Sequence, residues 1–508
     1  MDWRNGDGAG FQIKVCNPTR PQSKRLPHTA RVKTAEAMAQ VNNGVAFLLA
    51  GKLEKRHGTS TEVLFRQESQ FLYLSGFDHE EALLVVGLRQ AAKTSKMPLA
   101  PGDGWLFIDQ GDPVWGGGWL GTLEECAETY DVEQCFWLRD LTATMLELSP
   151  SEVYTMPNTD LPSGALPPGA TQVETGLSQG LGVARVTKTD MELDVMRLAS
   201  AIAVEEHKAI MQFVRCGNFE SDAESLFRYV AHNYGARHQA YLPIVGSGAS
   251  SALLHYNENA AMMEDGAIVL VDAAAELGGT RVGGGYASDI TRTWPCSGTF
   301  TAKQRAVHDV VNTAVEAGIA NAVEGSSFTV ASRAAFVAIL AGLLEIGILQ
   351  GGTVTEMYDA GIHTLFMPHS LGHSIGIDVH DGGNLSPFAP GMCITIEPGI
   401  YLYPTLLRPA FDDPQKARFL NQQLLEKEYM DFGGIRLEDV VVITEGGGPP
   451  ENMVSPALPR SAEDIEALMA MGTKTMADLG NPTTEGWEAR SRRPHALAHA
   501  QFAGDTVI

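Results

Sequence analysis

The sequence has few basic residues and few cysteines for its length. It carries 37 Lys and Arg against 61 Asp and Glu in 508 residues, which gives a formal net charge of −24. Affinity for nucleic acid depends on a basic surface, so this charge argues against a nucleic-acid partner. The six cysteines are scattered and form no C-x-x-C pair. We therefore expect reduced thiols and a cytoplasmic location.

Long hydrophobic runs are also lacking. The first twenty residues contain no apolar stretch of the kind found in signal peptides. The longest apolar stretch, at 334–349, is too short to cross a bilayer and includes Glu345. We expect this stretch to form a buried helix, and we expect no membrane partner.

What is present predicts a globular chain with more than one domain. Apolar residues make up 44% of the sequence, and 508 residues exceed what one ordinary core accommodates. In the first third, the pattern predicts a helix at 30–43 and strands at 44–51, 70–77, 81–88 and 104–113. Interleaved helices and strands indicate an α/β domain, which we place at 35–185 after an N-terminal extension at 1–34. A stretch rich in Pro, Gly and Ser at 157–170 is expected to be a loop or linker.

A second domain begins with a predicted helix. Thr189 and Glu192 form a capping box ahead of it. The apolar residues of this helix share one face: Met191, Val195, Leu198 and Ile202. Strand-like runs at 267–276, 393–402 and 439–445 are mixed with helical patterns at 303–323 and 328–349. We place this mixed domain at 186–465 and a polar, poorly ordered tail at 466–508.

Histidines are concentrated in one short stretch. The chain has 14 histidines, and His369, His373 and His380 all lie in "HSLGHSIGIDVH" with glycines between them. A single histidine is more often structural than functional. Three at spaced positions indicate a metal site, a proton-transfer site or coincidence, and acidic partners elsewhere are needed to decide.

Four carboxylates lie in strand-forming sequence, where a buried charge costs several kcal/mol unless it is paired or binds a metal. They are Asp272, Asp289, Glu397 and Glu438. Any one of them could be a solvated strand end. Together with a histidine they make a hard, oxygen-rich ligand set that suits Mn²⁺, Fe²⁺, Co²⁺ or Zn²⁺. Five protein ligands exceed the needs of one catalytic ion and fit a two-metal hydrolytic site.

Six ordered motifs carry a family resemblance. They are "LLHY", "LVDAAAE", "YASDITRTWP", "MPHSLGHSIGIDVHD", "ITIEPGIY" and "GGIRLEDVVVIT". Together they resemble the creatinase/methionine-aminopeptidase-type "pita-bread" metallopeptidases, and in particular the Xaa-Pro branch of aminopeptidase P and prolidase. The looser "FLYLSGFDHEEALLVV" resembles the N-terminal domain of that branch, so the likeness spans most of 35–450. It implies an α+β fold with a pita-bread catalytic domain preceded by a smaller α/β domain.

The resemblance implies a site with two divalent metal ions, usually Mn²⁺. Asp272 would bind one ion, His373 and Glu397 would bind the other, and Asp289 and Glu438 would bridge both. Glu397 would also accept a proton from the attacking water. A homodimer is expected by the same analogy.

The resemblance also implies roles for residues that are not ligands. His255 and His380 would be catalytic, since they contact the substrate and stabilise the tetrahedral intermediate or move protons. His369 would face the substrate. Arg436 would steady the metal-bound carboxylates and belong to the substrate side of the site.

Two departures from the family pattern stand out. The interval between Asp272 and Asp289 is 17 residues, where the family has 11, and the surplus falls in the glycine-rich run 277–285. A longer hairpin loop, a distorted pair of ligands and an error in gene prediction would each explain it. After Asn384, the chain lacks a loop that in the family carries a substrate-binding arginine.

The resemblance implies an exopeptidase with two metal ions that hydrolyses the bond before a penultimate proline. An Xaa-Pro aminopeptidase is the first reading and a prolidase, which takes dipeptides, is the second. One alternative is a pita-bread binding protein with weakened or lost peptidase activity, although such proteins generally lack the metal ligands. Another is a creatinase-like amidinohydrolase, which needs no metal.

Overall fold

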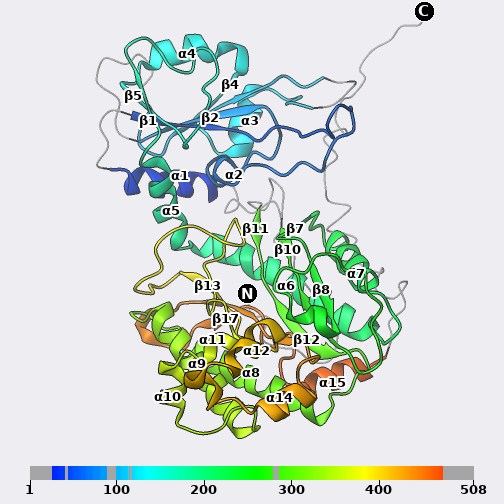
Figure 1. Cartoon of the computed structure of the whole chain (residues 1–508). Coiled ribbons are helices and arrows are strands. Elements are labelled where there is room, and N and C mark those ends of the chain that lie inside the picture. The colour runs from blue at the N-terminus through cyan, green and yellow to red at the C-terminus, as the bar shows by residue number, and fades with distance from the viewer. Residues whose placement is uncertain are drawn as a thin grey trace, which may run out of the picture.

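The computed structural model describes residues 26–39, 44–88, 99–112, 114, 117–277 and 285–472. They form a smaller N-terminal domain and a larger second domain, with the helix at 177–186 between them (Figure 1). The predicted extension up to residue 25, the tail from residue 473 and most of the glycine-rich run lie outside the described residues.

The N-terminal domain contains one six-stranded sheet with helices on both faces. Its elements are α1 Leu26–Ala37, β1 Gly44–Leu49, α2 Ser69–Ser75, β2 Ala82–Gly87, β3 Gly104–Ile108, α3 Leu123–Tyr130, β4 Gln134–Trp137, α4 Leu141–Leu148, β5 Glu152–Tyr154, β6 Thr171–Val173 and α5 Leu177–Val186. The strand order is β4-β3-β2-β1-β5-β6, with antiparallel β1, β2 and β3 at the centre and parallel pairs outside.

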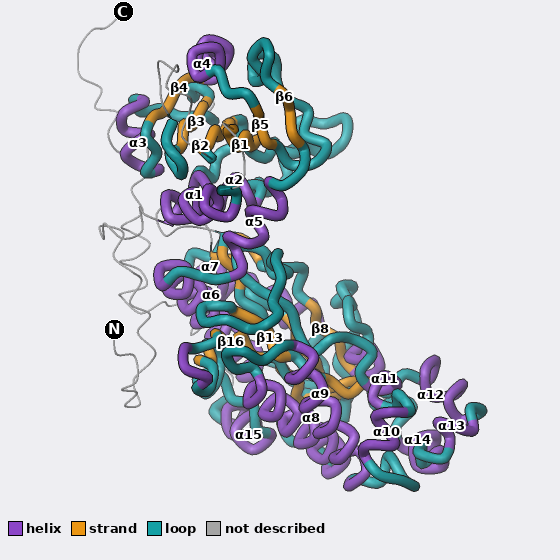
Figure 2. The backbone as a smooth tube through the Cα atoms, turned by 90° about the vertical axis from the view of Figure 1, so that its left-hand side faces the viewer, coloured by secondary structure: helices purple, strands orange, loops and turns teal. Residues whose placement is uncertain are grey.

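Alternating side chains bury both faces of this sheet. Val45 and Phe47 pack with α4 on one side, whereas Ala46 and Leu48 belong to the core that includes α1, α2 and α5. This follows from the two-residue period of a strand. Figure 2 shows α4 on the far side and α1, α2 and α5 on the side of the second domain. The latter core is continuous with that of the second domain.

The strand predicted at 70–77 is wrong, because α2 occupies this stretch. Glu68 caps the helix by accepting hydrogen bonds from the backbone N–H groups of Gln70 and Phe71, and Gly76 ends it with φ 67°. All of 71–75 is buried. A short run that is buried on every side shows no helical or strand period, so the sequence pattern could not separate the two.

The loop prediction at 157–170 is confirmed, because no helix or strand forms there. This loop joins β5 to β6, which are neighbours in one sheet, so it does not link the domains. The predicted domain boundary at 35 falls within α1.

The second domain mixes short antiparallel sheets with helices. Its elements are α6 Asp190–Phe213, α7 Glu220–Asn233, β7 His238–Gln239, β8 Ile244–Ser247, β9 Ile268–Asp272, β10 Ala275–Leu277, β11 Tyr286–Ala287, β12 Thr291–Pro295, α8 Ala302–Asn321, α9 Phe328–Glu345, α10 Val354–Asp359, α11 His363–Phe366, β13 Cys393–Ile396, β14 Gly399–Tyr401, α12 Pro404–Phe411, α13 Pro414–Ala417, α14 Gln422–Glu428, β15 Gly434–Arg436, β16 Asp439–Val442, β17 Glu451–Asn452 and α15 Ala462–Ala470. The predicted boundary at 465 falls within α15.

The capping box predicted ahead of α6 is confirmed. The Thr189 hydroxyl accepts from the backbone N–H of Glu192, and the Glu192 carboxylate accepts from the backbone N–H of Thr189. The buried face of α6 then packs against β10 and β11.

Two sheets meet at the centre of this domain. One has the order β12-β9-β8 and the other β13-β16-β17. The backbone N–H of Glu438 donates to the carbonyl of Thr291 at 3.0 Å, and the Thr293 hydroxyl donates to the carbonyl of Arg436 at 2.8 Å. These bonds hold β12 beside the chain that carries β15 and β16.

The helix predicted within 334–349 belongs to α9, which is buried on one face only. In the part of the chain that the structure describes, α9 is the one helix long and apolar enough to cross a membrane by length and composition. It packs against α8 and α10, and its buried residues are Ala331, Ala335, Ile339, Leu340 and Leu343. The predicted helix is thus present, but only 28% of this apolar window is buried, so its burial is partial.

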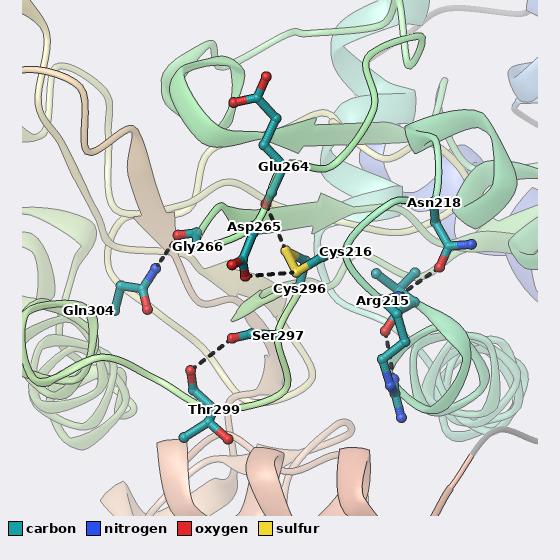
Figure 3. Close-up of a disulfide and its surroundings, with 11 residues drawn as sticks. Arg215, Cys216, Asn218, Glu264, Asp265, Gly266, Cys296, Ser297, Thr299 and Gln304 are labelled. Carbon is teal, nitrogen blue, oxygen red and sulfur yellow. Dashed lines mark hydrogen bonds between the residues drawn. A yellow bond between two sulfur atoms is a disulfide. The ribbon is translucent and has the colours of Figure 1, made fainter.

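The expectation of reduced thiols is also wrong for one pair. Cys216 and Cys296 form a disulfide (Figure 3). They lie 80 residues apart in sequence, and the fold brings the ends of α6 and β12 together so that their Cα atoms are 4.9 Å apart. Spacing in the sequence cannot reveal such a pair. The cytoplasmic location stays a prediction.

Candidate metal centre and active site

Four of the five predicted metal ligands lie at strand ends in the middle of the second domain. Asp272 ends β9, Asp289 lies just before β12, Glu397 follows β13, and Glu438 lies between β15 and β16. His373 lies on a segment that pairs with β13, since its carbonyl accepts from the backbone N–H of Thr395 at 2.9 Å. The central sheets therefore converge on one point.

The side chains of these residues form a continuous cluster. His373 Nε2 lies 3.4 Å from Asp289 Oδ2 and 3.4 Å from Glu397 Oε1. Asp289, His373 and Glu438 each offer one ligand atom within 4.8 Å of the others. The long interval between Asp272 and Asp289 does not separate them, because β9 and β12 pair in register with Asp272 opposite Thr291. The two residues therefore lie on neighbouring, paired stretches of chain despite the long interval.

Tyr241 joins the first two ligands and was missed in the sequence. Its hydroxyl lies 2.6 Å from Asp272 Oδ1 and 2.5 Å from Asp289 Oδ1. Its one proton is shared between these two carboxylates and fixes their orientation. Tyr241 stands three residues before β8 and belongs to no recognisable motif, so only the pairing of β8 with β9 brings it to the site.

Glu438 is the most buried of the five, with 1% of its surface exposed. Its Oε2 accepts from the Thr291 hydroxyl at 2.7 Å, but its Oε1 has no hydrogen-bond partner. Thr291 could have been found in the sequence, because it stands two residues after Asp289 and so lies on the same face of the strand. A buried carboxylate oxygen without a partner is expensive, and a cation would supply the missing partner.

Several pKa values in the cluster are raised, as expected where buried carboxylates outnumber cations. Burial, together with the charges of Asp289 and Glu397, raises the pKa of Glu438 well above its usual range. Burial raises the pKa of Glu397 to about 8, against the lowering effect of His373. Burial opposes the charged form of His373, but its hydrogen bond to Asp289 and the charges of Asp289 and Glu397 raise its pKa to about 9. The five residues thus fit divalent cations in donor type, charge and geometry.

The metal-free protein is therefore expected to lose stability as the pH rises. Glu397 holds a proton in the folded state between pH ~4.5 and ~8 that the unfolded chain has released, and His373 does so between ~6.5 and ~9. In both cases the folded state binds more protons, so the free energy of unfolding falls across these windows. We expect the melting temperature of chelator-treated protein to fall from pH 5.5 to 8.5 more steeply than that of Glu397→Gln. Equal slopes would contradict this account.

Two of the predicted substrate-side histidines lie on the open side of the cluster. His380 is exposed, and its ring centroid lies 4.2 Å from that of His373. Partial desolvation and the charge of His373 lower the pKa of His380, and the charge of His255 acts in the same direction. His255 is exposed as well. Both can contact a ligand in solution.

His369 has a fixed tautomer. Its Nδ1 donates to its neighbour Ser370's carbonyl at 2.8 Å, so its Nε2, 3.0 Å from the Tyr401 hydroxyl, is the accepting nitrogen. Burial and the nearby Arg436 charge lower the pKa of His369 to about 4. His369 is therefore neutral at physiological pH. Tyr401 is a second residue that the sequence reading missed.

Arg436 supports the ligands and does not face a substrate. Its guanidinium donates to Asp272 Oδ2 at 2.6 Å, to the Tyr401 hydroxyl at 2.8 Å and to the Thr291 hydroxyl at 3.1 Å. Only 3% of its surface is exposed. The placement favours the supporting role over the predicted substrate-binding role.

Glycines in "HSLGHSIGIDVH" allow the segment to approach its neighbours closely. A Cβ on Gly372 would lie 2.0 Å from the carbonyl oxygen of Thr395, so only glycine fits beside β13 here. After Asn384 the chain runs through a short loop into β13, as predicted. Phe388 in this loop is buried and packs on Phe328.

Comparison with known proteins decides the family. Residues 194–445 match the model of metallopeptidase family M24, and residues 28–154 match that of the aminopeptidase P N-terminal domain. A human Xaa-Pro dipeptidase is 32% identical over 469 residues, which cover 86% of this chain and 91% of that protein. The chain belongs to metallopeptidase family M24.

Other M24 relatives agree with this assignment. A probable Xaa-Pro aminopeptidase of Pyrenophora tritici-repentis is 30% identical over 479 residues. The aligned region covers 90% of this chain and 97% of that protein. The structure of Escherichia coli aminopeptidase P in complex with substrate matches with a TM-score of 0.73 and 28% identity, over 87% of this chain and 98% of that one. The predicted α+β fold, with an N-terminal domain ahead of an M24 catalytic domain, is confirmed.

Proposed function

We propose that the chain is a metal-dependent exopeptidase that hydrolyses the bond between an N-terminal residue and a penultimate proline. The observation that carries this proposal is the complete cluster of Asp272, Asp289, His373, Glu397 and Glu438 in one site, with the orphaned Glu438 Oε1 at its base. The matched relatives are named Xaa-Pro dipeptidases and Xaa-Pro aminopeptidases.

Two divalent ions, which we propose to be Mn²⁺, would be held by these five residues. When bound, such ions polarise a carbonyl group and lower the pKa of a water molecule in the site. A zinc-substituted form of the E. coli aminopeptidase P has been solved in complex with product.

The chain's own residues supply the remaining chemistry. Glu397 is more accessible than Glu438, with 18% of its side chain exposed, so it is the better placed of the two to take up a proton from a water molecule in the site. His255 and His380, both exposed beside the cluster, are placed to donate hydrogen bonds to a substrate carbonyl that gains negative charge. Neutral His369 and Arg436 hold the site from behind through Tyr401.

Hydrolysis should require proline at the second position. We expect protein supplied with Mn²⁺ to release the N-terminal residue from Ala-Pro or from Ala-Pro-Ala, and to leave Ala-Ala and Ala-Ala-Ala intact under the same conditions. Free alanine measured by chromatography gives the rates. Cleavage of the dipeptide alone would identify a prolidase, and cleavage of the tripeptide an aminopeptidase. If no proline-dependent cleavage occurs at any Mn²⁺ concentration, the proposal fails and a binding protein without catalysis is the better description.

A homodimer is part of the same proposal. It rests on the family resemblance, and sedimentation of the full chain at micromolar concentration tests it.

A further inference from the structure

His380 lies on a loop that is closed tightly upon itself. The Ser374 hydroxyl donates to the carbonyl of Asp381 at 2.6 Å, and the backbone N–H of Asp381 donates back to the carbonyl of Ser374 at 2.9 Å. A Cβ on Gly376 would lie 2.3 Å from Asp381 Oδ2, so the missing side chain leaves room for that carboxylate inside the loop. In the described residues, the His380 ring makes no hydrogen bond of its own, and its ring contact is with His373. The position of His380 therefore depends on the loop backbone.

Two aspartates that flank His380 are held by one arginine. Arg185 NH2 contacts both Asp378, at 2.6 Å, and Asp381. Lys188 Nζ adds a second cation 3.0 Å from Asp381. The side chains of Arg185, Lys188 and Asp381 are at most 4% exposed, so the contacts to Asp381 are shielded from solvent, whereas Asp378 is 39% exposed. Arg185 lies in the last turn of α5, which leads from the N-terminal domain into the catalytic domain.

The N-terminal domain reaches the same loop from its other side. The Ser69 hydroxyl, at the start of α2, donates to Asp378. Arg66 donates to the carbonyl of Ile377 at 2.9 Å and to both carboxylate oxygens of Glu276 at 3.2 Å. Arg66 and Arg185 thus fix the ends of the stretch 377–381 from outside the catalytic sheets.

We propose that Arg185 is a positioning residue that keeps His380 beside His373 by drawing Asp378 and Asp381 together. Without this guanidinium, two carboxylates three residues apart would repel each other at the edge of the site, and the loop that carries His380 would open. The N-terminal domain takes part through Arg66 and Ser69, so it contributes to catalysis by shaping this loop. The expected effect of Arg185 on kcat rests on the proposed peptidase function. The effect of Arg185 on the position of His380 does not.

A double-mutant cycle in the full, Mn²⁺-loaded chain tests the proposal. Arg185→Gln is expected to lower kcat on the Xaa-Pro substrate at least ~10-fold with a smaller change in KM, and Arg185→Lys to recover part of the loss. In the His380→Ala background, the same Arg185→Gln change should have little further effect, because its route to the substrate is already removed. Arg197→Gln, which breaks an ion pair with Glu451 at the protein surface, is the matched control and should leave kcat unchanged. Additive effects of Arg185→Gln and His380→Ala would overturn the proposal, since a purely structural ion pair predicts them.

A second readout does not depend on activity. In protein with ¹³C-labelled histidine, the His380 imidazole resonances are expected to shift in Arg185→Gln and stay unchanged in Arg197→Gln. If wild-type protein hydrolyses no Xaa-Pro peptide, the peptidase proposal fails while this measurement still decides the position of His380. If Arg185→Gln does not fold, Arg66→Gln removes the contacts to Ile377 and Glu276, together with those to Gln67, Ser69 and Asp378, and should shift the same resonances by a smaller amount. Unchanged His380 resonances in a folded variant would overturn the inference.

Discussion

Asp289→Asn is expected to lower kcat/KM for an Xaa-Pro substrate at least ~10³-fold, because an amide carries no charge with which to hold two cations. Asp289 is the residue on which the site converges: it contacts His373, shares the Tyr241 hydroxyl with Asp272 and belongs to the ligand group with Glu438. The metal content of the purified variant, measured by elemental analysis, should fall together with the activity.

The same substitution should not unfold the protein. The charge of Asp289 repels Glu438, but it also stabilises the charged form of His373, so its removal has two opposing effects on the metal-free state. We expect the melting temperature of chelator-treated Asp289→Asn to stay close to that of treated wild type. Asp412→Asn changes an exposed aspartate at the end of α12 and is the matched control for charge. A variant that keeps both metal and activity would show that the cluster is not the catalytic centre.

Arg292→Met is expected to produce the largest loss of stability. Arg292 is fully buried and pairs with Asp439, which is also fully buried, at 2.7 Å. It also donates to the carbonyl of Glu438 at 2.7 Å and to that of Pro459 at 2.9 Å. Asp439 keeps Arg460, 2.6 Å away, as a second cation, so the loss should lie at the low end for a broken buried pair, about 3 kcal/mol. At about 2 °C per kcal/mol for a large domain, the melting temperature should fall by about 6 °C.

A partly exposed ion pair provides the comparison. Arg197→Met breaks two hydrogen bonds to Glu451, at 2.7 and 2.8 Å, between side chains that are each about 30% exposed. Such a pair contributes about 1 kcal/mol. Calorimetry on both variants checks the contrast, and a loss for Arg292→Met as small as that for Arg197→Met would contradict the view that this buried network holds the strands behind Glu438.

Sequence reasoning found the parts of the fold that carry a periodic or local signal. The capping box at Thr189 and Glu192 is a local signal, and it marked the start of α6 correctly. Strand β1 was found from its run of apolar residues, which the sheet buries on both faces. The strand prediction at 70–77 failed, because a fully buried segment lacks the apolar–polar periodicity that distinguishes a helix from a strand.

The residues of the candidate site also divide into those with a local sequence signal and those without one. Carboxylates such as Glu438 could be found because an acid inside strand-forming sequence is unusual. Tyr241 and Arg185 could not be found in this way. A tyrosine near a strand and an arginine in a helix are ordinary, and their roles come from contacts with residues 31 to 196 positions away in the chain. The disulfide between Cys216 and Cys296 was hidden for the same reason.

The central claim is that this cluster, which would hold two divalent ions, is the site at which the chain hydrolyses the bond before a penultimate proline. It is tested most directly by titrating chelator-treated protein with Mn²⁺ and following release of alanine from Ala-Pro and Ala-Pro-Ala. The account predicts a rate on at least one of these peptides that rises with added metal and levels off near two ions per chain, while Ala-Ala and Ala-Ala-Ala stay intact. A rate on either peptide that is independent of Mn²⁺, or no release from either at any ratio, would contradict it.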